Sequence, residues 1–528
     1  MRRFSLLTAA ALIFVTGAIS LRASRGPELS EHELAVLKSC EGIVRLFERS
    51  SERIWPGFDL SRRPFVVYIP GRWTLLVNPP DGAKEFGILP ADWPPLGIRA
   101  GYLAGSYRDL VGQLAFDLEV GTAKTVALGL LDGQFDALGT KTPAMLGFIV
   151  HEAFHQYQGE SFGEIPWERE ERYPILDADN TALAALEMRI LEDAVSASLD
   201  GRRGKAEALL PMFGAVRTAR WSQAPPFVSR YEQGQEIREG TAAYVEKKSL
   251  ELVRGLEFDS ALEGRTTALR RDFGALSIAE LFRKDFEGRS TDGTVSPDDM
   301  IRNRIYPVGG ALGFLADLWG PGWKQELVRK VATFTFQEYF GDKLALKAED
   351  LAPLLEDAQA KYRYPAIRQS TAALIAGYRT GFERDLAGFE GQAGTRVEVR
   401  FRYRTISRSR SSQGRNWVVD NGGKALLTRA RVYSLKMDAL ALQIKEAAIY
   451  EENDWDTKDK RVAFFTPSPP EVVFDGAKKK LTPGPASIPF REIELTAPNL
   501  LFSARIPGAL RLENNRIVIE LAAGPATK

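Results

Sequence analysis

Two histidines four residues apart stand in the run His151-Glu152-Ala-Phe-His155, the part of this sequence best suited to metal chemistry. On a helix, residues at positions i and i+4 lie on one face about one turn apart, so both imidazoles can bind a single ion. Zinc is the ion that this His-Glu-x-x-His pattern predicts. Glu152 directly follows the first ligand, where a carboxylate can act as a base on a metal-bound water without itself binding the metal.

The scarcity of histidine favours this interpretation over ordinary surface or core histidines. The chain has 3 histidines in 528 residues, and two of them form the pattern. With histidine so rare, a chance match is expected on the order of once in a thousand such sequences. The third, His32, falls in the first turn of a predicted N-terminal helix, so we expect it to be solvated and not to be a ligand.

A catalytic zinc has three protein ligands and one open position. Because the remaining histidine lies in a distant helix, the third ligand is expected to be a carboxylate. Glu187 and Glu192 on one predicted downstream helix, and Glu239 on another, are the candidates. Their spacing from the histidines does not choose between them.

The helix that carries the histidines has local signals at both ends. Thr142 can accept a hydrogen bond from a free backbone N–H group, and Pro143 suits the first helical position. Gly159 can adopt the left-handed conformation that ends many helices. The sequence therefore predicts one helix from Thr142 to Gly159.

One helix and three strands are predicted before it. They are a helix over 31–50 with Ser30 as its N-cap, a β-hairpin with strands 65–69 and 73–77 around Pro70-Gly71, and a strand over 125–131. Strands that lead into the histidine helix would place the site at a sheet edge. Cys40 is the only cysteine, which excludes an intramolecular disulfide, and we expect it to be buried on the first helix.

The pattern after the histidine helix is first helical and then β. We expect a solvated loop over 160–173, for which the alternative is a flap over the cleft. Helices are predicted over 178–199, 205–221 and 231–252, and further helices follow to about residue 386. Strict alternation from residue 396 predicts an antiparallel β-domain. The basic run 404–415 is expected to be a solvated hairpin loop. The alternative is a binding site for an anionic glycan or lipid headgroup.

These elements predict an α+β fold with several parts. The expected parts are a signal peptide or anchor over 1–23, an N-terminal helix and β-rich part over 24–140, a helical metal-binding part over 141–386 and the β-domain over 395–528. A net charge of +1 gives no global field that would favour nucleic acid, so no nucleic-acid partner is expected.

The N-terminus has the order of an export signal. Arg2 and Arg3 precede an uncharged run from Phe4 to Leu21, which small residues follow. An exported bacterial protein, periplasmic or secreted, is the simplest interpretation. The alternative is a retained N-terminal membrane anchor, because the apolar run is at the short end for a membrane span.

The histidine run and a later segment together resemble the gluzincin metallopeptidases. In that superfamily, a His-Glu-x-x-His helix is followed by a helix whose Glu completes the zinc site. The segment Glu239-Gly-Thr-Ala-Ala-Tyr-Val-Glu246 is similar to the context of that Glu. The resemblance implies that Glu239 is the third ligand.

A second segment resembles the M1-type aminopeptidases within the same superfamily. Tyr306-Pro-Val-Gly309-Gly310-Ala is similar to their Tyr-x-x-Gly-Ala segment, whose tyrosine stabilises the tetrahedral intermediate. The resemblance implies this role for Tyr306. The interval from His155 to Glu239 is longer than theirs, so one or two extra helices are expected between the two ligand helices. The segment that holds a substrate's free N-terminus in those enzymes is missing, so exopeptidase activity is not implied.

The expectation is an exported zinc-dependent peptidase that acts on a peptide or protein substrate. Zinc would activate water, Glu152 would move the proton to the leaving amine, and Tyr306 would donate to the oxyanion. The alternative is a catalytically silent exported binding protein that acts through its β-domain. Glu152 favours catalysis, because a structural zinc would prefer a fourth ligand. The substrate, endo or exo preference and oligomeric state stay open.

Overall fold

The structure of the protein is a computed structural model. It describes residues 25–108, 110, 114–129, 142–166, 168, 170–253, 281–282, 286, 290–291, 294–403, 407–437, 439–478 and 484–522. The predicted signal segment 1–23 lies outside these residues, as does the side chain of His32. Within the described ranges, none of the helices combines the length and apolar character needed to cross a membrane.

Helices and strands are both abundant, so the α+β class is confirmed. Contacts divide the chain into two compact units, Met1–Gln156 with Lys248–Leu276 and Tyr157–Lys247 with Ser277–Lys528. The division falls inside two continuous helices, α3 (Thr142–Ser161) and α7 (Thr241–Val253). The boundaries predicted near residues 140 and 395 instead lie at the start of α3 and between the long helix α14 (Tyr364–Glu390) and strand β8 (Thr395–Arg402).

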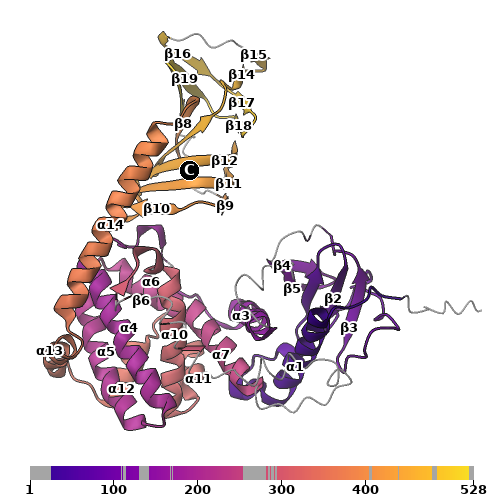
Figure 1. Ribbon diagram of the computed structural model, residues 1–528, viewed down its shortest axis with the longest axis vertical. Coiled ribbons are helices and arrows are strands. Elements are labelled where there is room, and N and C mark those ends of the chain that lie inside the picture. Colours follow the sequence, from indigo (N-terminus) through magenta and orange to yellow (C-terminus); the bar gives the residue numbers. More distant parts are fainter. Residues whose placement is uncertain are drawn as a thin grey trace, which may run out of the picture. The chain divides into compact units, whose positions relative to one another are not determined.

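The first unit contains helix α1 (Glu31–Ile54) and a five-stranded sheet (Figure 1). Ser30 is the N-cap of α1, as predicted, and it also forms a capping box with Glu33. Cys40 on this helix is buried. The strands are β1 (Phe65–Ile69), β2 (Trp73–Val77), β3 (Ala100–Ala104), β4 (Leu114–Val120) and β5 (Ala123–Gly129), in the order β3-β2-β1-β5-β4. The predicted hairpin is confirmed, since β1 and β2 pair antiparallel with Ile69 opposite Trp73.

Helix α3 does not end where the sequence predicted. It continues to Ser161, two residues past Gly159. Gly159 does not have the positive φ angle of a helix-ending glycine, and a Cβ there would meet nothing within 4 Å. The glycine is therefore an exposed helical residue, and the prediction of a C-terminus at this position was wrong.

The second unit begins with helices and ends with a sheet (Figure 1). Its helices include α4 (Ala178–Leu199), α5 (Arg203–Gln223), α6 (Phe227–Gln235), α10 (Arg302–Ala316), α11 (Gly322–Arg329), α12 (Phe336–Leu344), α13 (Leu351–Lys361) and α14 (Tyr364–Glu390). The three helices predicted over 178–252 are confirmed, with one difference. Between α6 and α7 the helix passes through a π-helical turn, η3 (Glu236–Gly240), which the sequence analysis did not predict.

The C-terminal part is one curled sheet of 13 strands. They are β8 (Thr395–Arg402), β9 (Ser407–Ser412), β10 (Asn416–Val419), β11 (Lys424–Met437), β12 (Leu440–Asn453), β13 (Asp459–Thr466), β14 (Glu471–Phe474), β15 (Ala477–Lys478), β16 (Gly484–Phe490), β17 (Ile493–Ala497), β18 (Leu500–Ala504), β19 (Gly508–Glu513) and β20 (Arg516–Leu521). The β pattern predicted from residue 396 is confirmed. One pair departs from the antiparallel prediction, because β20 runs parallel to β8.

The basic run 404–415 is not the solvated hairpin loop that was predicted. Six of its residues form β9, which pairs antiparallel with β11. Arg408 on this strand makes ion pairs with Glu451 and Glu171. Arg415 pairs with Asp298 and lies over the ring of Trp417, 3.6 Å from its centroid. The arginines of β9 alternate with serines, so the two residue types fall on opposite faces of the strand. Arg408 and Arg415 both have acidic partners.

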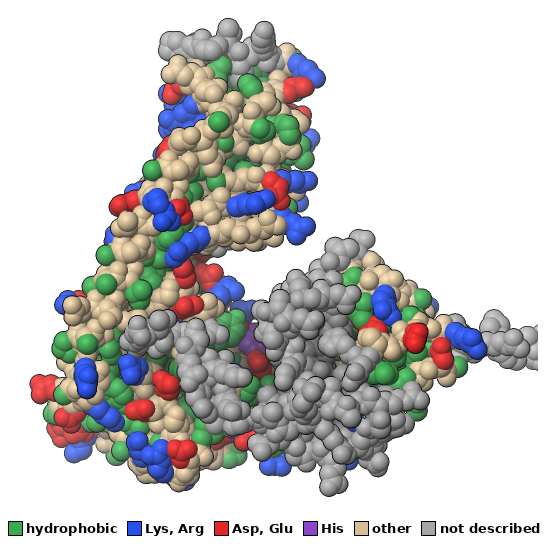
Figure 2. Space-filling model, viewed as in Figure 1, with side chains coloured by type: hydrophobic (Ala, Val, Ile, Leu, Met, Phe, Trp, Pro, Cys, Tyr) green, Lys and Arg blue, Asp and Glu red, His purple; other side chains and the backbone are tan. Residues whose placement is uncertain are grey.

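Charged side chains of both signs are interspersed over α14 and the C-terminal sheet on the face shown in Figure 2. Exposed ion pairs such as Arg368–Asp179 and Arg402–Asp459 follow this pattern. Such pairs each contribute about 0–1 kcal/mol to stability. The helical part is therefore held together by other interactions.

Six buried charged side chains join five helical segments of the second unit. They are Glu187 on α4, Arg217 and Arg220 on α5, Glu232 on α6, Glu236 in η3 and Arg304 on α10, which we call the ion network. None of them is more than 3% exposed. Arg220 Nε lies 2.6 Å from Glu187 Oε1, and Arg220 Nη2 lies 2.5 Å from Glu232 Oε2. Arg217 Nη2 lies 2.7 Å from Glu236 Oε1.

Ion pairing, more than burial, decides the charge of Glu232. Burial alone would raise the pKa of this carboxyl group, but the guanidinium groups of Arg220 and Arg304 hold its pKa well below the usual value. At Glu236 burial outweighs pairing, so its pKa is raised although Arg217 lowers it. Three arginines and three glutamates therefore form a compact cluster in which each charge depends on its neighbours.

We expect Arg220→Met to destabilise the protein by about 3–5 kcal/mol, because it leaves two buried carboxylates without their main partner. The matched control is Arg203→Met, which removes an exposed i,i+4 pair with Glu207 on the same helix. That change should cost no more than about 0.5 kcal/mol. Urea unfolding of both variants measures the difference. Equal losses would show that the ion network does not hold the helices together.

Candidate metal centre

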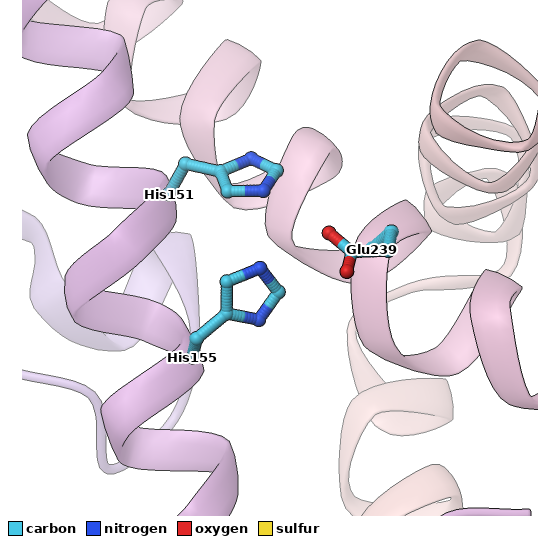
Figure 3. Close-up of side chains that lie close together, drawn as sticks. All are labelled: His151, His155 and Glu239. Atoms are coloured by element: carbon cyan, nitrogen blue, oxygen red, sulfur yellow. The ribbon is translucent and has the colours of Figure 1, made fainter. Parts of the chain in front are cut away.

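Three side chains predicted to bind a metal lie close together. His151 and His155 project from α3, and their ring centroids are 4.8 Å apart with the planes at 81°. One ligand atom from each histidine and one carboxylate oxygen of Glu239 all lie within 4.8 Å of one another. Figure 3 shows both imidazoles directed towards the carboxylate, which comes from a neighbouring helix. Two imidazoles and one carboxylate are a donor set typical of catalytic zinc.

The apolar side of α3 fixes the helix that carries the histidines. Ile149, Val150 and Phe154 are fully buried. The ring of Phe154 packs edge-on against Trp55 and Phe58, with centroid distances of 5.0 and 5.2 Å. These contacts restrict rotation of α3 about its own axis, which sets the direction of the imidazoles on the same helix.

The three ligand side chains differ in exposure. His151 is 5% exposed, whereas His155 and Glu239 are only partly buried. Glu152, the predicted base, follows His151 on α3 and is also partly buried. His155, Glu239 and Glu152 are therefore still accessible to solvent, whereas His151 is enclosed. A catalytic zinc site needs such access, because water and substrate must reach its open position.

Glu239 belongs to the π-helical turn η3. The N–H group of Thr241 donates to the carbonyl of Glu236, five residues back, and not to that of Ile237 as it would in an α-helix. Turns of this kind are rare in proteins, and those that do occur are frequently found at functional sites. The turn changes the direction of the side chains within it, and no local sequence signal predicted it.

A contact between two glycines brings α10 against this turn. A Cβ atom added to Gly240 would lie 2.5 Å from the Cα atom of Gly309, and the reverse distance is also 2.5 Å. Side chains at either position would push the two helices apart. Tyr306 precedes Gly309 by three residues, so it lies on the same side of α10, near the crossing.

Arg302 provides a second link between Tyr306 and Glu239. Burial would lower the pKa of this arginine, but its hydrogen bond to Glu170 raises the pKa, and so do its electrostatic interactions with Tyr306 and Glu239. Arg302 Nε lies 2.6 Å from Glu170 Oε2. One guanidinium therefore lies within electrostatic reach of both residues for which the resemblance implied roles.

The other two candidate carboxylates are placed elsewhere. Glu187 is fully buried and bonded to Arg217 and Arg220 of the ion network. Glu192 lies on α4 beside Asp193; burial raises the pKa of Tyr362, and these two carboxylates raise it further. Among the described residues, the group of possible metal ligands contains Glu239 and neither of these.

Sequence reasoning missed two residues at this site, Gln158 and Arg302. Gln158 lies on α3, three residues after His155, and Arg302 lies on α10, one turn before Tyr306. Helical spacing from the predicted site residues was the signal that could have found both.

Comparison of the chain with models of protein families finds no match, and searches of curated proteins and of solved structures find no similar protein.

The glycine contact leads to a prediction about stability. Gly240→Ala should destabilise the protein by about 1–3 kcal/mol, because the added methyl group meets backbone atoms of α10. Gly159→Ala is the control, since its methyl group meets nothing and alanine is the better helix former by about 0.5–1 kcal/mol. Chemical denaturation should therefore show opposite changes. A Gly240→Ala protein as stable as Gly159→Ala would mean that the helices do not cross at this glycine.

Proposed function

We propose that this protein is an exported zinc-dependent hydrolase of peptide bonds, of gluzincin type. The observation that carries the proposal is the convergence of His151, His155 and Glu239, with ligand atoms within 4.8 Å of one another. Three protein ligands from two imidazoles and a carboxylate leave a zinc ion an open position for water or substrate. The resemblance to gluzincins supports peptide bonds as the substrate.

Zinc held by these residues would lower the pKa of bound water towards neutrality and polarise the substrate carbonyl. Glu152 accepts a proton from water and later donates it to the leaving amine. Its position next to His151 on α3, with partial exposure, supports this role.

Tyr306 donates a hydrogen bond to the oxygen on which negative charge develops. Three observations support this role. The residue lies one turn from the Gly240–Gly309 contact, it is partly buried, and it shares the neighbourhood of Arg302 with Glu239. Such a donor acts only as charge develops, so it accelerates the reaction without tighter binding of the substrate.

The proposed metal set is tested by substitution of two carboxylates. Glu239→Ala should lower the zinc affinity by more than about a hundredfold, a larger effect than the loss of an outer partner. Glu192→Ala should leave the affinity unchanged and is the matched control. Chelator competition measures both. Unchanged affinity in Glu239→Ala, or a loss in Glu192→Ala, would show that the third ligand is a different residue.

A third variant, Glu152→Gln, separates catalysis from metal binding. Glu152→Gln should keep the wild-type zinc affinity but reduce peptide cleavage by about a hundredfold to ten-thousandfold, because the base is lost. A wild-type protein that binds zinc but cleaves no member of a peptide library would instead favour the silent binding protein.

Tyr306→Phe should lower kcat by about a hundredfold to a thousandfold with KM and zinc content nearly unchanged. Phenylalanine fills nearly the same volume, so a tyrosine that serves only packing would tolerate the change. Steady-state kinetics decide between a catalytic role and a packing role. They are measured on the peptide of the library that the wild-type protein cleaves fastest, with Glu152→Gln as the blank. Wild-type turnover in Tyr306→Phe would remove this residue from the mechanism.

A further inference from the structure

Gln158 connects the helix that carries the histidines to the turn that carries Glu239. Its amide nitrogen Nε2 lies 3.1 Å from the carbonyl oxygen of Ile237, 2.9 Å from that of Arg238 and 2.9 Å from Thr241 Oγ1. The side chain is 3% exposed. Two amide hydrogens are thus shared among three acceptors in a site closed to water.

The π-helical turn explains why this amide is needed. In an α-helix, the carbonyl of Ile237 would accept from the N–H group of Thr241, but here that group donates to Glu236. The Ile237 carbonyl accepts instead from Gln158 Nε2 and from Thr241 Oγ1, which lies 2.5 Å away. Gln158 Nε2 therefore supplies one of the two donors of this buried carbonyl, and the loss of a donor to a buried polar group costs free energy.

We infer that Gln158 is a positioning residue of the proposed metal centre, which fixes the turn bearing Glu239 against the helix bearing His155. The inference rests on the proposed function. Gln158 follows His155 by three residues on α3, and the carbonyls that it binds belong to the two residues immediately before Glu239. The hydrogen bonds therefore join the backbones of two ligand-bearing segments within one helical turn of each ligand.

The physical need for such a link follows from the tolerance of metal coordination. Ligand atoms must lie within about 0.2 Å of their preferred distances for full affinity. Glutamate has a long side chain, so its carboxylate samples many positions unless its backbone is fixed. Arg217 holds the start of the turn through Glu236, and Gly309 packs against its end at Gly240. Gln158 adds the direct connection to α3.

The test compares glutamine substitutions at two positions. Gln158→Met removes the donor and keeps the size of the side chain, and Gln158→Asn keeps an amide that is too short to reach the carbonyls. Gln233→Met is the matched control, because Gln233 Nε2 donates to the carbonyl of Phe334 at 2.9 Å from helix α6, outside the π-helical turn. Each full-length protein is assayed for zinc affinity by chelator competition, for the visible spectrum of bound Co²⁺ and for stability without metal.

Gln158→Met and Gln158→Asn should each lose about tenfold to a hundredfold in zinc affinity, as expected for an outer partner of a ligand, and the Co²⁺ spectrum should change. Gln233→Met should lose stability but keep the wild-type affinity and spectrum. If Gln158→Met does not fold, Gln158→Asn provides the measurement.

Two results would overturn the inference while the proposed function stands. One is wild-type zinc affinity and Co²⁺ spectrum in both Gln158 variants. The other is an equal loss of affinity in Gln233→Met, which would indicate general loosening of the helices. Failure of the wild-type protein itself to bind zinc would overturn the inference together with the proposed function. This outcome is distinguished from the other two by the wild-type measurement alone.

Discussion

The buried ion network is the constraint on which the helical part depends. Arg217 and Arg220 lie on α5, and their partners come from α4, α6 and η3. Arg304 of α10 joins the network through Glu232. A buried ion pair is seldom more stable than well-packed apolar residues, but removal of one partner is costly, so the network permits few alternative arrangements of these helices. Its last member, Glu236, is the first residue of the π-helical turn. The network therefore fixes the backbone three residues before Glu239.

The turn itself departs from regular helix geometry at the position where function is proposed. Such departures are expected where chemistry requires a side-chain direction that a regular element does not give. Here the surrounding contacts compensate for the departure. Gln158 supplies donors to the carbonyls of the turn, and Gly309 allows α10 to pack directly on Gly240. The residues that shape this site thus come from three different helices.

Local patterns in the sequence predicted the elements well but not the way in which they meet. The N-cap at Ser30 and the hairpin around Gly71 use neighbouring residues, so both could be predicted directly from the sequence. The site histidines were found because one helix carries both. The π-helical turn, the Gly240–Gly309 contact and the ion network depend on residues far apart in the chain, and no local pattern encodes them. Gly159 shows the opposite error. A glycine at this position could have ended the helix, but the chain does not adopt a positive φ angle there, and the helix continues.

His151, His155 and Glu239 are proposed to hold one zinc ion. Crystals grown with zinc and measured on both sides of the zinc absorption edge test this proposal most directly, because the anomalous signal locates the metal itself. We expect one strong peak per chain, about 2.0–2.2 Å from a nitrogen of each histidine and an oxygen of Glu239. An anomalous peak at other residues, or no peak at these three in crystals that contain zinc, would contradict the proposal.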